Sequence, residues 1–150
     1  MHRMPTELLG ELGWHSNSIC CPITEGTWPA IFASAQVAVH GADCLQAESV
    51  YAMCRPPGRH AYPDLMTGVC YLNNAAIATQ RTVQRFGKFA VIDIDVHHCN
   101  GTQFIFWDRP DVLVCSVHVD PNLTAPYYAW HADETGGAAG EGCNFNQPLP

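Results

Sequence analysis

The chain has 150 residues, of which 47% are hydrophobic and 14% charged, and it carries a net charge of −7 with a pI near 5.5. These values exclude a disordered chain and predict one globular domain over residues 1–150. The acidic balance argues against a nucleic-acid partner and suits a neutral or cationic one. The longest apolar stretch, residues 28–39, is too short to span a bilayer, and the N-terminus lacks the apolar core of a signal peptide. We therefore expect a cytoplasmic protein without a membrane partner.

Apolar runs and turn signals predict an alternation of helices and strands. Residues 27–46 are typical of a helix that carries Trp28, Ile31, Phe32 and Ala35 on one stripe. The remaining predicted elements are a strand over 49–54, a helix over about 73–86 that Gly87 stops, a strand over 89–95, a short helix over 101–107, a strand over 112–118 and a long loop from Val119 onward.

This alternation predicts an α/β fold, a parallel sheet flanked by helices on both faces. Strands buried on both sides are nearly continuous apolar runs, as these are. In open sheets of this class, sites lie beyond the carboxyl ends of the strands. The unusual polar clusters all fall at such ends: RPPGRH at 55–60, DIDVHH at 93–98 and SVH at 116–118.

The eight cysteines raise the question of disulfides or a structural metal. No two of them form a Cys-x-x-Cys pair, and several lie in apolar runs such as VYAMC and VLVCS. This pattern favours reduced core cysteines over a disulfide scaffold, and it lacks the ligand spacing of a cysteine-based zinc site.

A run of acidic residues and histidines ends the strand over 89–95. If the strand alternation continues, Asp93, Asp95 and His97 share one face. Buried carboxylates need a partner charge, and a divalent metal supplies it compactly; oxygen and nitrogen donors favour zinc or iron(II). The alternative is an aspartate pair that accepts hydrogen bonds from backbone amides at a strand end.

The other histidines receive separate interpretations. His60 follows the rigid RPPG turn and is either a solvated or core hydrogen-bonding histidine or, beside a metal, a general base. His98 points away from His97 and is expected to be structural. Either His118 or His131 could line the pocket, but solvated loop roles are expected for both.

Several motifs, in order, resemble those of the histone deacetylase superfamily. They are CRPPGRHA, GVCYLNNAAIA, VIDIDVHHCNGTQFIF, RPDVLVCSVHVDP and HADETGGAAGEGCNFNQPLP. The segments PITEGTW and HADETG most resemble the acetylpolyamine amidohydrolase and bacterial deacetylase-like branch. The resemblance covers about residues 22–150, and it implies the arginase/deacetylase fold with zinc at the strand ends.

The resemblance also implies roles for individual residues. Asp95 and His97 would be two of three protein ligands of zinc, His60 would be the general base, and Asp93 and Asn100 would orient the histidines.

A structural K⁺ or Na⁺ is implied beside the zinc, held by the Asp93 side chain and by carbonyls near Asp95, His97, Ser116 and Val117. Tyr71 and Gly68, in the GVCY segment, would wall the substrate tunnel.

The implied reaction is the hydrolysis of an acetylated amine by a metal-activated water. The expected substrates are small cationic acetylated amines, such as acetylpolyamines, or acetyl-lysine peptides, because the chain is acidic. A homo-oligomer is compatible with the sequence.

The chain departs from the family pattern at two positions and in its extent. Arg59 stands where the family has the first histidine of the pair in RPPGHHA, and Cys99 stands where it has glycine. Arginine cannot shuttle protons at neutral pH; pointing inward it would compete with zinc, and pointing outward it would only remove a histidine. Cys99 would be strained at positive φ, and its thiol would be near the metal.

The chain stops near the midpoint of the family domain, ahead of the third zinc ligand and the catalytic tyrosine. An incomplete deacetylase-like domain is therefore expected. Two interpretations remain open: a zinc amidohydrolase that the missing half completes, and an inactive remnant that binds metal weakly or serves association only.

Overall fold

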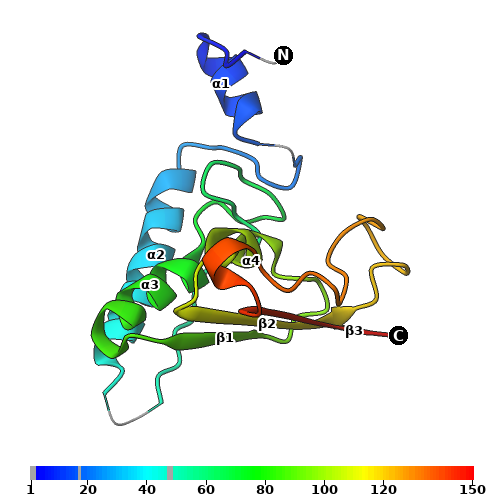
Figure 1. The fold of residues 1–150 in the computed structure, drawn as a ribbon. Helices are drawn as coiled ribbons and strands as arrows, with labels where there is room; N and C mark the ends of the chain where they lie inside the picture. Colours follow the sequence, from blue (N-terminus) through cyan, green and yellow to red (C-terminus); the bar gives the residue numbers. More distant parts are fainter. Residues whose placement is uncertain (1–2, 17, 47–48) are drawn as a thin grey trace.

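The computed structural model describes residues 3–16, 18–46 and 49–150. Its elements, in chain order, are α1 (Leu8–Trp14), α2 (Thr27–Cys44), α3 (Asn74–Phe86), β1 (Phe89–Asp93), α4 (Asn100–Phe106), β2 (Val112–Val119), the short 3₁₀ helix η1 (Ala138–Gly140) and β3 (Asn144–Leu149). Figure 1 shows α2, α3 and α4 together on one side of the sheet, with α1 at the far end of the molecule. Within the described ranges, no helix is both long and apolar enough to cross a membrane.

The sheet is parallel throughout, with the strand order β1-β2-β3. Its register places Asp93 beside Ser116 and Ser116 beside Asn146, so the carboxyl ends of the strands meet at one edge. The predicted parallel sheet with helices is thus confirmed.

The strand β3 lies in the segment that we predicted as a loop, and that prediction was wrong. The run NFNQPL is polar and so does not look like a strand. It forms one because its buried side chains, Asn144 and Asn146, both donate hydrogen bonds to Gln103 Oε1, at 2.9 and 3.0 Å. Pro148 is compatible with β3 because this strand forms the edge of the described sheet.

The helix α3 agrees closely with its prediction. Asn73 caps its N-terminus by accepting a hydrogen bond from the Ala76 amide at 2.9 Å, and Gly87 ends it with a φ of 82°. A residue with a Cβ would be strained at that φ, so the glycine gives the helix a defined end.

The helix α2 ends two residues earlier than predicted, and its apolar stripe is divided. Ile31 and Ala35 are buried, whereas Trp28 and Phe32 are exposed and stack on each other with 5.6 Å between ring centroids.

The strand predicted over residues 49–54 does not form. Val50, Tyr51 and Met53 are exposed, and no strand of the described residues pairs with this segment. A short apolar run with high β-propensity stays irregular where no neighbouring strand completes its hydrogen bonds.

The helices of the described residues cover one face of the sheet only. Val112 and Val114 on that face are buried against α3 and α4. On the opposite face Ile92 is 70%, Leu113 39% and Phe145 53% exposed. The expected burial of the strands on both sides is therefore absent from the residues described.

Candidate active site

The strand β1 ends at Asp93, so Asp95 and His97 lie in the bend that follows it. The predicted continuation of strand alternation through these residues was wrong. The bend closes on its own side chains: the Asp95 amide donates to Asp93 Oδ1 at 3.0 Å, and the His97 amide donates to Asp95 Oδ1 at 2.8 Å. The carboxylates thus satisfy backbone donors, as the alternative interpretation expected.

Arg59 lies between these two carboxylates. Its Nη2 forms an ion pair with Asp95 Oδ1, and its Nε lies 3.8 Å from Asp93 Oδ2. Burial raises the pKa of Asp95, but the His97 amide and the Arg59 charge outweigh it and hold this pKa below its usual range. Of the two orientations considered for Arg59, the side chain adopts the inward one.

His60 forms a short chain of hydrogen bonds. Its Nδ1 lies 2.5 Å from Asn100 Oδ1, and Asn100 Nδ2 donates to the Tyr62 hydroxyl at 3.0 Å. Since the Asn100 amide nitrogen is the donor to Tyr62, its oxygen accepts from His60 Nδ1–H, and Nε2 keeps the lone pair. Burial lowers the pKa of His60 despite the Asn100 hydrogen bond, and the Arg59 charge adds to the effect, so the ring is neutral at pH 7.

A cavity of about 390 Å³ lies beside this histidine. It is lined by Pro57, Arg59, His60, Thr67, Gly68, Val69, His97, Asn100, Ala125 and Trp130. The rings of His60 and His97 lie 6.4 Å apart, centroid to centroid. The cavity therefore brings together four predicted site residues, His60, Gly68, His97 and Asn100, and also Arg59.

Gly68 fits closely against the His60 ring. Its φ is +56°, and a Cβ at this position would lie 2.7 Å from His60 Cδ2. Tyr71, predicted beside it as a tunnel wall, is not among the residues that line the cavity; its hydroxyl donates instead to the Pro22 carbonyl at 2.6 Å. Ala125 and Trp130 also line the cavity, from a loop remote in the chain, and no pattern in the sequence predicts their place there.

Cys99 lies beneath the site. Its φ is −84°, so the expected strain is absent, and it is fully buried in the core with Val112 and Val114. Burial raises the pKa of its thiol to about 12, so the group is a neutral packing residue at pH 7. All eight cysteines are unpaired as expected, but only Cys21, Cys70 and Cys99 are buried.

The expectation of a solvated loop for His118 was wrong. This residue lies in β2 and is buried; its Nδ1 contacts the Ser116 hydroxyl at 3.0 Å and its Nε2 donates to the Trp130 carbonyl at 3.0 Å. His98 is buried, as its structural interpretation requires, whereas His131 is half-buried in the loop before Glu134.

The described residues do not fit a divalent metal as they are arranged. No group of three or more His, Cys, Asp or Glu side chains gathers anywhere in residues 3–16, 18–46 and 49–150. Asp95 and His97 offer two donors, fewer than the three protein ligands usual for catalytic zinc, and the Arg59 cation contacts one of them. The predicted zinc or iron(II), and the K⁺ or Na⁺ beside Asp93, Ser116 and Val117, remain predictions.

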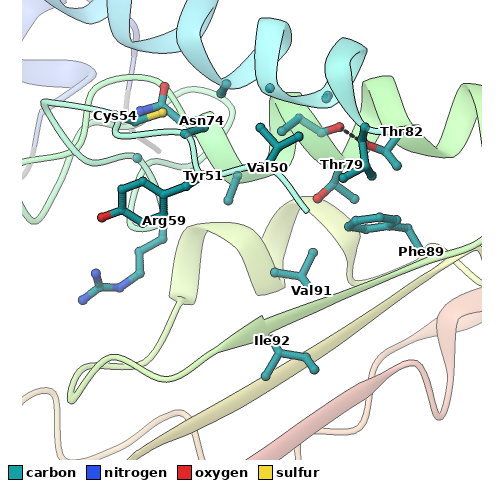
Figure 2. A pocket seen from close by; sticks show the side chains of 18 of the residues that line it. Val50, Tyr51, Cys54, Arg59, Asn74, Thr79, Thr82, Phe89, Val91 and Ile92 are labelled. Carbon is teal, nitrogen blue, oxygen red and sulfur yellow. Dashed lines mark hydrogen bonds between the residues drawn. The ribbon is translucent and has the colours of Figure 1, made fainter. Parts of the chain in front are cut away.

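A second hollow of about 640 Å³ lies on the other side of Arg59 (Figure 2). Apolar side chains of α2, α3, β1 and the segment before Arg59 line most of it. His60, His97 and Asn100 line the smaller cavity and do not line the larger hollow. The smaller cavity is therefore the candidate active site.

Known proteins resemble nearly the whole of this chain in sequence. The histone deacetylase domain profile matches residues 3–150. Acetylpolyamine amidohydrolase 1 of Pseudomonas aeruginosa is 53% identical over 149 residues, which are 97% of this chain and 43% of the relative. Acetylpolyamine amidohydrolase 2 of the same organism is 51% identical over 148 residues, again 97% of this chain and 43% of the relative.

A solved structure extends the similarity to the fold. The acetylpolyamine aminohydrolase of Burkholderia pseudomallei superimposes with a TM-score of 0.90 at 44% identity, covering 99% of this chain and 45% of that protein. The chain thus spans less than half the length of the relatives that it matches. With its profile, its relatives and its fold in agreement, the chain belongs to the histone deacetylase domain family of deacetylases and amidohydrolases.

Proposed function

We propose that the protein removes acetyl groups from acetylated amines by hydrolysis, with His60 as the proton acceptor. The observation that supports this most directly is the His60–Asn100 hydrogen bond on the wall of the cavity. A neutral imidazole with a free lone pair on Nε2 accepts a proton from water, and Asn100 holds the ring in the required tautomer. The relatives named acetylpolyamine amidohydrolases support the same reaction class.

The proposed substrates are small cationic acetylated amines or acetyl-lysine side chains. The net charge of −7 favours a substrate whose remaining amines are positive, because their attraction raises the local substrate concentration. The relatives' names point to acetylated polyamines, which have this chemistry.

We include zinc in the proposed reaction only for a site in which Arg59 does not form its ion pair with Asp95. There Asp95 and His97 would be two of its donors, and the metal would polarise the amide carbonyl and acidify water. Because the present arrangement does not fit a metal, the steps assigned to this chain are limited to substrate enclosure and to the proton transfer at His60.

Hydrolysis of N-acetylputrescine by the natural full-length protein tests the proposal. We expect His60→Gln to lower kcat by about 100-fold to 10,000-fold, the usual contribution of a general base. His40→Gln on the exposed side of α2 is the matched control and should keep the parent rate. If His60→Gln retains the parent kcat, His60 is not the base.

A second candidate is a protein of this fold without catalytic activity. The contact of Arg59 with both aspartates favours it, because this cation occupies the carboxylates that the family's chemistry would need. A parent protein that does not turn over acetylated amines, beside an Arg59→His variant that does, would support this candidate.

A further inference from the structure

The carboxylates of Asp93 and Asp95 place two negative charges at the same edge of the folded sheet. The exposed fractions of their side chains are 14% and 39%, and Asp95 follows Asp93 by two residues. Two carboxylates held close together and partly withdrawn from water repel each other unless a cation lies between them.

We propose that the Arg59 guanidinium takes the place of a divalent metal ion at this edge of the sheet and keeps such an ion out. The side chain is 20% exposed and contacts both acids, with Nη2 on Asp95 and Nε 3.8 Å from Asp93. Figure 2 shows it reaching away from the apolar side chains around it. The cation is therefore supplied by the chain itself.

The backbone of Arg59 is fixed from the opposite side. Its carbonyl accepts hydrogen bonds from the Thr102 amide at 3.1 Å and from Asn73 Nδ2 at 3.3 Å. Both donors are buried, so the start of the arginine side chain is anchored in the core. The packing of α3 and α4 against the turn thus fixes the backbone of Arg59, and the contacts with Asp93 and Asp95 hold its side chain inward.

This arrangement opposes metal binding in two ways. A divalent ion at Asp95 and His97 would meet a positive charge in contact with one of its own ligands, which weakens binding electrostatically. It would also have to displace the guanidinium from both acids, which breaks the ion pair with Asp95 and removes the cation from beside Asp93. The inference does not rest on the proposed activity, since it concerns contacts within the folded chain.

Metal retention and thermal stability of the full-length protein test the inference. The variants are Arg59→His, which removes the cation and adds a donor, Arg59→Met, which only removes the cation, and Arg59→Lys, which keeps a charge. Arg81→Met is the matched control, because Arg81 pairs with Asp43 at 2.6 Å on the exposed surface, far along α3. Zinc affinity is measured by competition with a chromophoric chelator, and thermal midpoints are measured in chelator and in zinc.

We expect Arg59→His to bind zinc at least about tenfold more tightly than the parent, since the loss of one adjacent positive charge alone is worth roughly that factor. Arg59→Met should melt below the parent in chelator and gain more stability from zinc than the parent does. Arg59→Lys and Arg81→Met should bind zinc as weakly as the parent.

Two results would overturn the inference. One is a parent that holds zinc as tightly as Arg59→His. The other is Arg59→Met with the melting temperature of the parent in chelator, because the acid pair would then need no cation. Should Arg59→Met fail to fold, the comparison of Arg59→Lys with Arg59→His still decides, since only the former retains the charge.

Discussion

Among the histidines near the candidate site, His98 has the pKa that is lowered most. It contacts Gln103 Oε1 at 2.9 Å and Asn146 Oδ1 at 3.1 Å, and it stacks on Trp130 with 5.2 Å between ring centroids. Burial, with His118 against its edge, lowers its pKa to about 4. The neutral ring therefore ties β3 and the loop at Trp130 to α4.

This pKa predicts a loss of stability in mild acid. In the unfolded chain His98 takes up a proton near its ordinary pKa of 6.5, whereas the folded form resists until about pH 4, so stability falls as the pH drops between these values. The full contribution is about 3 kcal/mol. The free energy of unfolding, measured with urea at pH 7 and pH 4.5, should fall less for His98→Gln than for the parent. An equal fall in both proteins would contradict the lowered pKa of His98.

Gly68 offers a test of how closely the proposed base, His60, is held. A Cβ at this position would press on the His60 ring, so Gly68→Ala should displace the imidazole and lower kcat by about tenfold to 100-fold. Gly13→Ala is the control, because a Cβ at Gly13 meets no other atom within 4 Å. An unchanged kcat in Gly68→Ala would show that the ring position is not critical.

At the residue scale, the sequence predicted which side chains lie together better than it predicted their contacts. His60, His97 and Asn100 do meet at one cavity. The motif could not show which way Arg59 points, because that depends on where the acids lie after β1 ends. Nor could it place Trp130, because loops hold their side chains by contacts that leave no periodic pattern.

At the element scale, Asn73 joins the first turn of α3 to the segment that carries the site. Its Oδ1 caps the helix, and its Nδ2 lies within hydrogen-bond distance of the Ala61 carbonyl at 3.0 Å and of Thr102 Oγ1 at 3.1 Å. One buried amide thus connects α3, α4 and the turn at Arg59.

Asn73→Ala should therefore lower the free energy of unfolding by about 2–4 kcal/mol, since it removes a cap and leaves buried carbonyls unpaired. Chemical denaturation checks this, with Asn122→Ala in the exposed turn after β2 as the control. The control should change stability by less than about 0.5 kcal/mol. A similar small effect for Asn73→Ala would contradict the central role of this amide.

Elements with a strong local signal were predicted well, and those that depend on distant partners were not. The helix α3 has a cap, a helical period and a glycine stop, all within its own sequence. The strand β3 depends on Gln103 to satisfy its buried asparagines, and the run over 49–54 lacks a partner strand. Local propensity does not reveal either condition.

At the scale of the whole molecule, the main feature is the face of the sheet that no described helix covers. Ile92, Leu113 and Phe145 lie exposed on it, on three neighbouring strands. An apolar surface of this kind favours association in water. The apolar runs alone do not predict this exposure, because a strand that is apolar on both faces has the same pattern whether or not another element covers it; the incomplete domain that the sequence predicts does imply an uncovered apolar surface.

The 150-residue chain on its own should therefore self-associate, and Phe145→Glu should reduce this association. Sedimentation velocity at several protein concentrations measures it. Trp28→Glu, which adds the same charge at an exposed position of α2, is the control and should leave the association unchanged. Equal effects of the two substitutions would show that net charge, not the sheet face, governs the association.

The strand order β1-β2-β3 also has a kinetic consequence. Each strand pairs with the strand that precedes it in the chain, so every new strand meets an edge that is already formed. The first connection carries α4, and the second, over residues 120–143, is a longer loop that carries the short η1, so no other strand comes between neighbouring strands of the described sheet. Assembly of this sheet can accordingly proceed stepwise from β1 towards β3 as the polypeptide emerges from the ribosome, without waiting for a distant segment to return.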